Sequence, residues 1–199
     1  GLKVGRSEYG RRAAISHTAS ITGSAEVNSA VFRQMGLIEA DDLDEIIDVA
    51  TLLARKIPDG HEKTAVFASS GGAASLCADN VGSAGLTLAK FTTETTTKLR
   101  AALPDFAAID NPVDTTSITI SDPQAFLNSL DPVARDPEVG VVLLPIAMDY
   151  AEITATTARL IIEAQADHDT PLCPIWMSDR TGEGYQILQQ AGITPIRSL

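Results

Sequence analysis

The chain has 199 residues, enough for one large domain or two small ones, and 44% of them are hydrophobic, so it can build a packed core. Its net charge of −11 at pH 7 argues against DNA or RNA as the main partner, because phosphate backbones attract surfaces rich in Lys and Arg. No apolar run approaches membrane-spanning length and no signal peptide is visible. Cys77 and Cys173 lie far apart in apolar runs, which indicates small core residues in a reducing compartment, so we expect a cytoplasmic protein.

The first part of the chain differs in pattern from the rest. Residues 5–24 are rich in Gly, Ser, Thr and Arg and have no clear period, which predicts a loop. Helices are predicted over 25–34 and from 41 to 54, where apolar residues recur at helical spacing. A Pro-Asp-Gly turn ends this part, so we expect two domains, residues 1–57 and 58–199.

From residue 64 onward, short apolar strands alternate with helices. Strands that are apolar throughout and are joined by helices indicate a parallel sheet covered on both faces. Five or six of them predict an α/β fold, a doubly wound parallel sheet of the flavodoxin-like type. Strands are predicted at 65–68, 86–88, 139–146, 172–177 and 193–196 with a further one ending at Asp114, and helices at 70–81, 93–103, 122–134, 152–166 and 182–190.

Ligands bind such sheets at the edge where strands finish and helices begin. At the end of the first predicted strand of this domain lies a turn of small residues: Ser69, Ser70, Gly71, Gly72 and Ala73. Glycines let the backbone approach a ligand, and the free N–H groups at a helix start favour an anion. The spacing is neither that of a P-loop nor that of a G-x-G-x-x-G motif, so a turn shaped only for packing is an equally good interpretation.

Two further places hold residues that can carry chemistry. His17 lies between Ser16 and Thr18 in a segment that three arginines precede, where an imidazole suits a nucleophile or a general base. On these residues alone, an ordinary loop histidine is the alternative. Asp114 ends a predicted strand just after Asn111 and a proline, where a functional carboxylate and a plain turn fit equally well. The three histidines of the chain are too widely spaced for a metal-ligand pattern.

Residues 3–8 and 12–20 closely resemble the "KxGRSE…AAxSHTGS" segment of NDP-forming acyl-CoA synthetases. This family includes the ADP-forming acetate–CoA ligases and belongs to the succinyl-CoA synthetase superfamily. Ala19 stands where the family commonly has Gly. The resemblance spans nearly the whole chain, because further matching motifs follow in the right order at 30–36, 41–45, 69–72, 78–79, 85–86 and 111–114.

The resemblance implies part of an acid–thiol ligase that forms acyl-CoA, or ATP from acyl-CoA, through an acyl phosphate and a phosphohistidine. His17 takes the position of that histidine. The turn Ser69–Ala73 resembles one of the two helix N-termini that hold its phosphoryl group. Residues 1–57 would be the C-terminal part of a first flavodoxin-like domain with the phosphohistidine loop, and residues 58–199 a second such domain.

The resemblance also implies cofactors and partners. The complete enzyme would use CoA, ATP or ADP, and Mg, whereas we expect this chain alone to be inactive and to bind tightly only phosphate or a similar anion. Its expected partners are CoA-binding and ATP-grasp domains, or a subunit that carries them, and a small carboxylic acid, in an oligomer without nucleic acid or membrane.

Two other readings stay open. One is a catalytically degenerate ligase scaffold that acts as a regulator or as a protein acyltransferase subunit; an intact His17 argues against it. The other is a plain flavodoxin-like binding module, for which flavin is weakly supported because aromatic residues make up only 5% of the chain.

Overall fold

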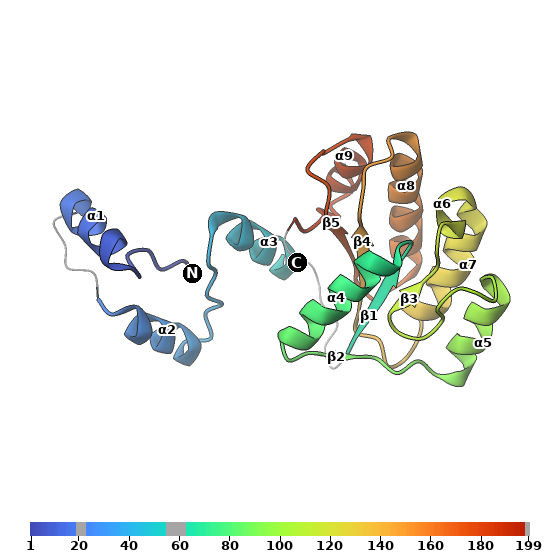
Figure 1. Cartoon of the computed structure of the whole chain (residues 1–199), viewed down its shortest axis with the longest axis horizontal. Coiled ribbons are helices and arrows are strands. Elements are labelled where there is room, and N and C mark those ends of the chain that lie inside the picture. The colour runs from blue at the N-terminus through green and yellow to red at the C-terminus, as the bar shows by residue number, and fades with distance from the viewer. Residues whose placement is uncertain (19–22, 55–62, 198–199) are drawn as a thin grey trace. The chain divides into compact units, whose positions relative to one another are not determined.

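The computed structural model describes residues 1–18, 23–54 and 63–197 (Figure 1). The chain divides into two compact units, Gly1–Arg55 and Lys56–Leu199, called here the first and the second unit. Within the described residues, no helix is both long and apolar enough to cross a membrane.

The described part of the first unit contains the helices α1 (Glu8–Thr18), α2 (Ala25–Gln34) and α3 (Leu43–Leu53). The predicted helices at 25–34 and 41–54 are therefore confirmed. Neither α2 nor α3 buries a residue. The segment before α1 is tied to the segment before α3 by a parallel bridge between Leu2 and Ala40.

The loop predicted over residues 5–24 is wrong for residues 8–18, which form α1. The start of this helix is supported by Ser7, whose hydroxyl accepts a hydrogen bond from Gly10 N at 3.1 Å. An ion pair between Glu8 and Arg12 adds an i,i+4 contact. Helical periodicity fails here because the large apolar side chains of α1, Tyr9 and Ile15, are exposed and form no stripe toward a core.

The second unit is built on a five-stranded parallel sheet with the order β2-β1-β4-β5. The remaining strand, β3, pairs with the end of β1, while β2 pairs with its beginning. This arrangement, with helices on both faces, confirms the predicted flavodoxin-like fold. The strands are β1 (Lys63–Ala68), β2 (Thr87–Leu88), β3 (Val113–Asp114), β4 (Val141–Ile146) and β5 (Leu172–Trp176).

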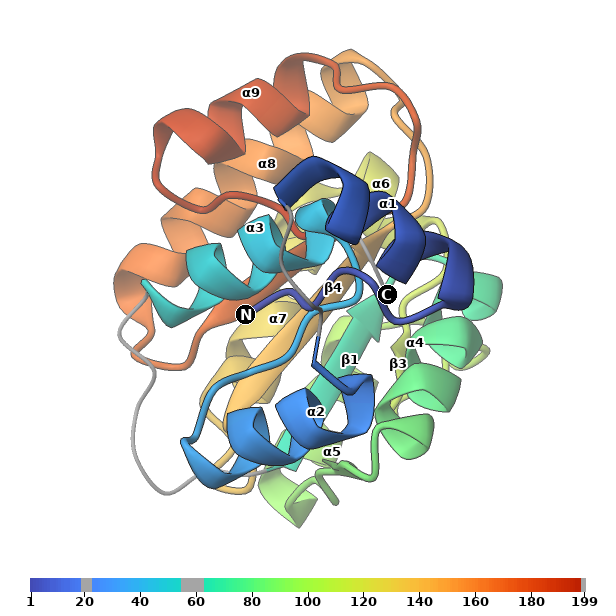
Figure 2. The ribbon, with the colours of Figure 1, turned by 90° about the vertical axis from the view of Figure 1, so that its left-hand side faces the viewer.

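The helices of the second unit cover two cores, one on each face of the sheet. Phe67 on β1 points into the larger core, to which α5, α7, α8 and α9 contribute, whereas its neighbours Val66 and Ala68 point into the smaller core under α4. Figure 2 shows α8 and α9 side by side. The helices are α4 (Gly71–Ser83), α5 (Thr93–Ala102), α6 (Ile118–Ser121), α7 (Pro123–Ala134), α8 (Glu152–Asp167) and α9 (Glu183–Gln190).

Two details depart from the sequence prediction. The short helix α6 was not predicted. The strand predicted at 193–196 is reduced to one parallel bridge between Ile175 and Ile196. Pro195 has no N–H to donate to a ladder, which limits pairing in this segment. Cys77 and Cys173 are both buried free thiols, as predicted.

Candidate functional site

The turn Ser69–Ala73 joins the end of β1 to the start of α4. Ser70 is the N-cap residue, and its carbonyl accepts a hydrogen bond from Ala74 N at 2.9 Å. Its hydroxyl makes no capping hydrogen bond. Helix geometry leaves the first N–H groups of α4 without an intrahelical acceptor, so the turn offers backbone donors and hydroxyls to an anion.

The two glycines of the turn face different surroundings. A Cβ at Gly71 would lie 2.8 Å from Asp114 Oδ2, whereas a Cβ at Gly72 would meet only Ser70 Oγ, at 3.9 Å. Asp114 also accepts a hydrogen bond from Thr116 N at 2.9 Å through its other oxygen. The close approach at Gly71 places the Asp114 carboxylate beside the positive end of α4, so the structure brings Asp114 and the turn together.

Asn111 has a structural role along the side of β1 that faces β2 and β3. Its Oδ1 accepts a hydrogen bond from Val66 N at 3.0 Å, and its Nδ2 donates to Thr64 O at 2.8 Å and to Ala89 O at 2.9 Å. The Asn111 side chain thereby makes the hydrogen bonds to β1 that a strand backbone would make, in the interval between the short strands β2 and β3. The peptide bond that joins it to Pro112 is cis.

His17 is the penultimate residue of α1, and its side chain is exposed, as is that of Ser16. Thr18 ends the helix, and its side chain lies outside the described part. None of the described residues gives the imidazole of His17 a hydrogen-bond partner. His17 belongs to the first unit and the turn to the second, and each is described within its own unit.

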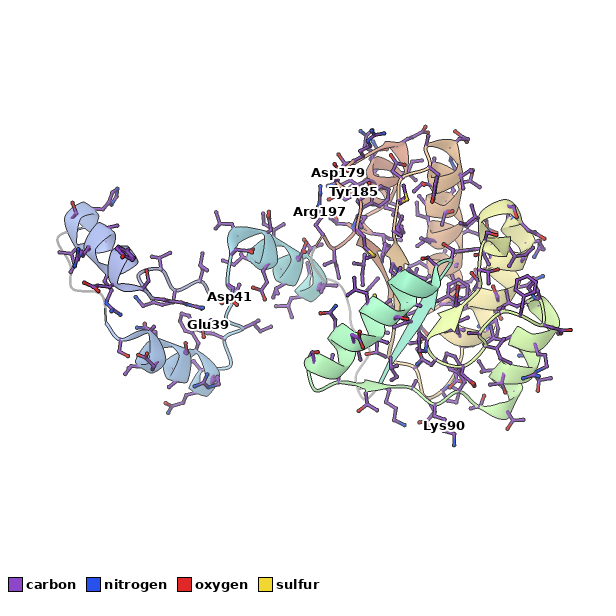
Figure 3. All side chains as sticks on the ribbon, viewed as in Figure 1. Glu39, Asp41, Lys90, Asp179, Tyr185 and Arg197 are labelled. Atoms are coloured by element: carbon purple, nitrogen blue, oxygen red, sulfur yellow. The ribbon has the colours of Figure 1, made fainter. Side chains whose placement is uncertain are left out.

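The arginines near His17 are held by other groups. Arg6 forms ion pairs with Glu39 at 2.8 Å and with Asp41, both of which lie on the segment between α2 and α3 (Figure 3). Arg12 pairs with Glu8, and Arg11 donates to the Arg6 carbonyl at 3.0 Å. These arginines are therefore engaged with carboxylates and with a backbone carbonyl of the first unit.

Each of the two units matches the profile of a known protein family. The profile of the family "Succinyl-CoA ligase like flavodoxin domain" matches residues 2–53, and that of the family "Ligase-CoA domain" matches residues 64–167. The chain belongs to the Ligase-CoA domain family. The resemblance found in the motifs is thereby confirmed, because relatives of this Ligase-CoA chain are named ADP-forming acetate–CoA ligases.

Two such relatives come from Pyrococcus furiosus and Archaeoglobus fulgidus. The alpha subunit of acetate–CoA ligase [ADP-forming] II from Pyrococcus furiosus is 32% identical over 96% of this chain and 42% of its own length. Acetate–CoA ligase [ADP-forming] I from Archaeoglobus fulgidus is 32% identical over 100% of this chain and 28% of its own length. The Ligase-CoA chain thus spans less than half the length of these relatives.

Among solved structures, the dinucleotide forming acetyl-coenzyme A synthetase 1 from Ca. Korarchaeum cryptofilum, in complex with phosphate and ADP, has a TM-score of 0.84 and 25% identity. The match covers 99% of the Ligase-CoA chain and 43% of that protein.

The sequence does not single out several residues that organise the carboxyl edge of the sheet. The hydroxyl of Thr115 donates to Ala68 O at 3.1 Å and contacts Thr119 Oγ1 at 2.6 Å, which fixes the loop after β3. The Asp149 carboxylate lies against Gly182 at the start of α9, a second pairing of an acid with a helix start. Threonine and aspartate are frequent in any loop, so no local signal distinguishes them.

The described residues include no group of three or more His, Cys, Asp and Glu side chains that could hold a metal ion.

Proposed function

We propose that this chain is the phosphoryl-carrying part of an ADP-forming acid–thiol ligase, which joins a small carboxylic acid to CoA. His17 is the residue that carries the phosphoryl group, and the turn Ser69–Ala73 binds that group during transfer. The observation that carries the proposal is the turn itself, where the start of helix α4 presents backbone N–H groups and two serine hydroxyls. The exposed imidazole of His17 supplies the nucleophile.

The reaction proceeds in three transfers in the direction of acyl-CoA synthesis. The neutral imidazole nitrogen of His17 attacks the γ-phosphorus of ATP, a P–N bond forms, and ADP leaves. A carboxylate oxygen of the acid then attacks the same phosphorus, the P–N bond breaks, and an acyl phosphate results. The CoA thiol loses its proton and attacks the acyl carbon, and inorganic phosphate leaves with the C–O bond electrons. Each step is reversible, so the same residues serve ATP formation from acyl-CoA.

The charges of the two helices favour the transfer. A phosphoryl group on His17 adds negative charge in the last turn of α1, where the helix dipole is unfavourable to anions. The start of α4 is favourable to them, by about 0.3–1 kcal/mol for an exposed group. The phosphoryl group is therefore more stable at the start of α4 than at the end of α1. Asp114 already lies on the Gly71 side, so the phosphoryl group binds on the side of Gly72 and Ala73.

The remaining machinery belongs to the complete enzyme. We propose that residues 1–57 complete a first flavodoxin-like domain and that residues 58–199 form a second one. CoA-binding and ATP-grasp domains, on the same polypeptide or on a partner subunit, supply CoA, nucleotide and Mg. This division is supported by relatives that are more than twice as long as the matched part. By itself the chain makes no acyl-CoA.

The experiment uses the complete enzyme with ATP, CoA and a panel of carboxylic acids. His17→Ala should abolish acyl-CoA formation, whereas Ser16→Ala, one residue away on the same exposed helix end, should retain the activity within a few-fold. If His17→Ala makes acyl-CoA at the wild-type rate, the phosphohistidine mechanism is wrong. If the wild-type enzyme with intact partner domains makes no acyl-CoA, the degenerate ligase scaffold is favoured instead.

A further inference from the structure

A cavity of about 190 Å³ opens beside the turn at the carboxyl ends of β1 and β4. Its inner wall is formed by the buried side chains of Phe67, Leu144 and Ile161. Its mouth is lined by Met148 and Ile153, which are 57% and 44% exposed. The cavity therefore runs from the surface of the second unit into its larger core.

The described residues that line the cavity are uncharged and mostly apolar. Among the described residues, no Asp, Glu, Lys, Arg or His side chain contributes to it. Its threonine hydroxyls are already engaged within the protein: Thr119 contacts Thr115 at 2.6 Å, Thr154 accepts from Tyr150 N at 2.7 Å, and Thr157 donates to Ile153 O at 3.1 Å. An occupant consequently gains from burying apolar surface rather than from binding a second charge.

The cavity and the turn share two residues, Ser69 and Ser70. An anionic group at the start of α4 would therefore be continuous with an apolar chain in the cavity. An acyl phosphate has this form, with a charged head and an uncharged tail, and so has the carboxylic acid from which it is made. The shared serines set the two ends of the ligand next to each other.

We propose that this cavity binds the tail of the carboxylic acid and selects uncharged branched-chain or single-ring acids over dicarboxylic ones. The assignment rests on the proposed function, because that function supplies the anionic head at the turn. The volume suits such tails, since an apolar cavity of about 150 Å³ takes up benzene. Acetate would leave most of the space unfilled, and each further buried methylene strengthens binding about fourfold.

A dicarboxylic acid such as succinate should bind at least tenfold more weakly than an apolar acid of similar size. Its second carboxylate would enter a wall without any cation, and a buried polar group without a partner is costly. Selection of the acid thus depends on residues of β4 and α8, and Thr157 on α8 is the position from which the cavity can be filled.

The test measures binding of benzoate, isobutyrate, acetate and succinate to the 199-residue chain by NMR titration. Benzoate and isobutyrate should bind more tightly than acetate, and succinate at least tenfold more weakly than benzoate. Thr157→Phe, which fills the cavity, should weaken benzoate at least tenfold. Thr156→Phe, the same change at a neighbouring position that does not line the cavity, should leave benzoate affinity within twofold.

Thermal unfolding of each variant establishes that it is folded, and Ala147→Phe, at an exposed position of the lining, replaces Thr157→Phe should the latter unfold. Wild-type affinity of a folded, cavity-filled variant for benzoate would overturn the proposal, as would equal affinity for succinate and benzoate. Labelling of His17 by ATP in the complete enzyme is measured in parallel. Binding without labelling would retain an apolar-acid site but overturn its assignment to the ligase substrate, whereas labelling without binding would overturn the cavity proposal alone.

Discussion

The carboxylate of Asp114 and the Cα of Gly71 are so close that a methyl group at Gly71 would lie 2.8 Å from Asp114 Oδ2. Strand pairing sets this proximity, because Asp114 is opposite Ala68 in the register of β1 and β3. The acid is held from its other side by Thr116 N at 2.9 Å. A strand end, a helix start and a carboxylate are therefore fixed together at the edge where we place the phosphoryl group.

Gly71→Ala should lower the free energy of unfolding by about 1 kcal/mol, because the new methyl displaces Asp114 and breaks its hydrogen bond to Thr116. Gly72→Ala should instead be neutral or stabilising by up to about 1 kcal/mol, since its methyl has room and alanine favours a helix. Urea denaturation of both variants measures the difference. Equal effects at the two positions would show that the close approach to Asp114 is unimportant.

Asp114→Asn should raise the affinity of the chain for inorganic phosphate about two- to fivefold. The substitution removes a negative charge beside the helix start that the anion would occupy, an effect of about 0.3–1 kcal/mol. Calorimetric titration gives the affinity. Asp149→Asn is the matched control, because it removes the same charge at the start of α9 and should leave phosphate binding unchanged. Weaker phosphate binding in Asp114→Asn would mean that this carboxylate organises the turn.

Asn111→Asp should destabilise the second unit by about 2–4 kcal/mol. Aspartate retains an acceptor for Val66 N but loses the donors to the carbonyls of Thr64 and Ala89, which are then left facing a carboxylate. Asn80→Asp serves as the control and should cost less than about 1 kcal/mol, because the Asn80 amide donates an exposed hydrogen bond to Leu76 O within α4. The comparison uses urea midpoints, and similar losses in the two variants would refute the strand-substituting role of Asn111.

Burial raises the pKa of the Cys77 thiol to about 11. The unfolded chain has an ordinary thiol, with a pKa near 8.5, so the folded state holds this proton more tightly. The resulting stability is complete below about pH 8.5 and is lost as the pH rises to about 11. Cys77→Ala should therefore show a smaller decline in unfolding free energy than the wild type across this range. Parallel declines in the two proteins would contradict the shift.

The sequence predicted most of the second unit because its signals are local and strong. An apolar run such as Val141–Ile146 specifies a buried strand directly. An N-cap residue followed by proline, such as Asp122 before Pro123, specifies a helix start directly. Helix α1 could not be found in this way, since its stability comes from local pairs such as Glu8–Arg12 rather than from an apolar face. The turn Ser69–Ala73 was evident from its small residues.

The residues that contact the turn are placed there by pairing between strands that are far apart in the sequence. The approach of Asp114 to Gly71 and two of the three hydrogen bonds of Asn111 join residues more than 40 positions apart, and the third, to Ala89 O, spans 22 positions. The cavity likewise combines residues from β1, β4 and α8, most of which are apolar residues of the kind found in any core. Only the fold identifies these sets, which is why the acid-binding side of the site could not be read from the sequence.

The most direct test of the central claim is to supply the complete enzyme with radiolabelled ATP and to locate the bound phosphoryl group by mass spectrometry. The account predicts a label that is labile in acid and stable in base, lies on His17, is absent from His17→Ala, and is discharged by ADP or by a carboxylic acid. A label on another residue, or acyl-CoA formation without any phosphoprotein, would contradict it.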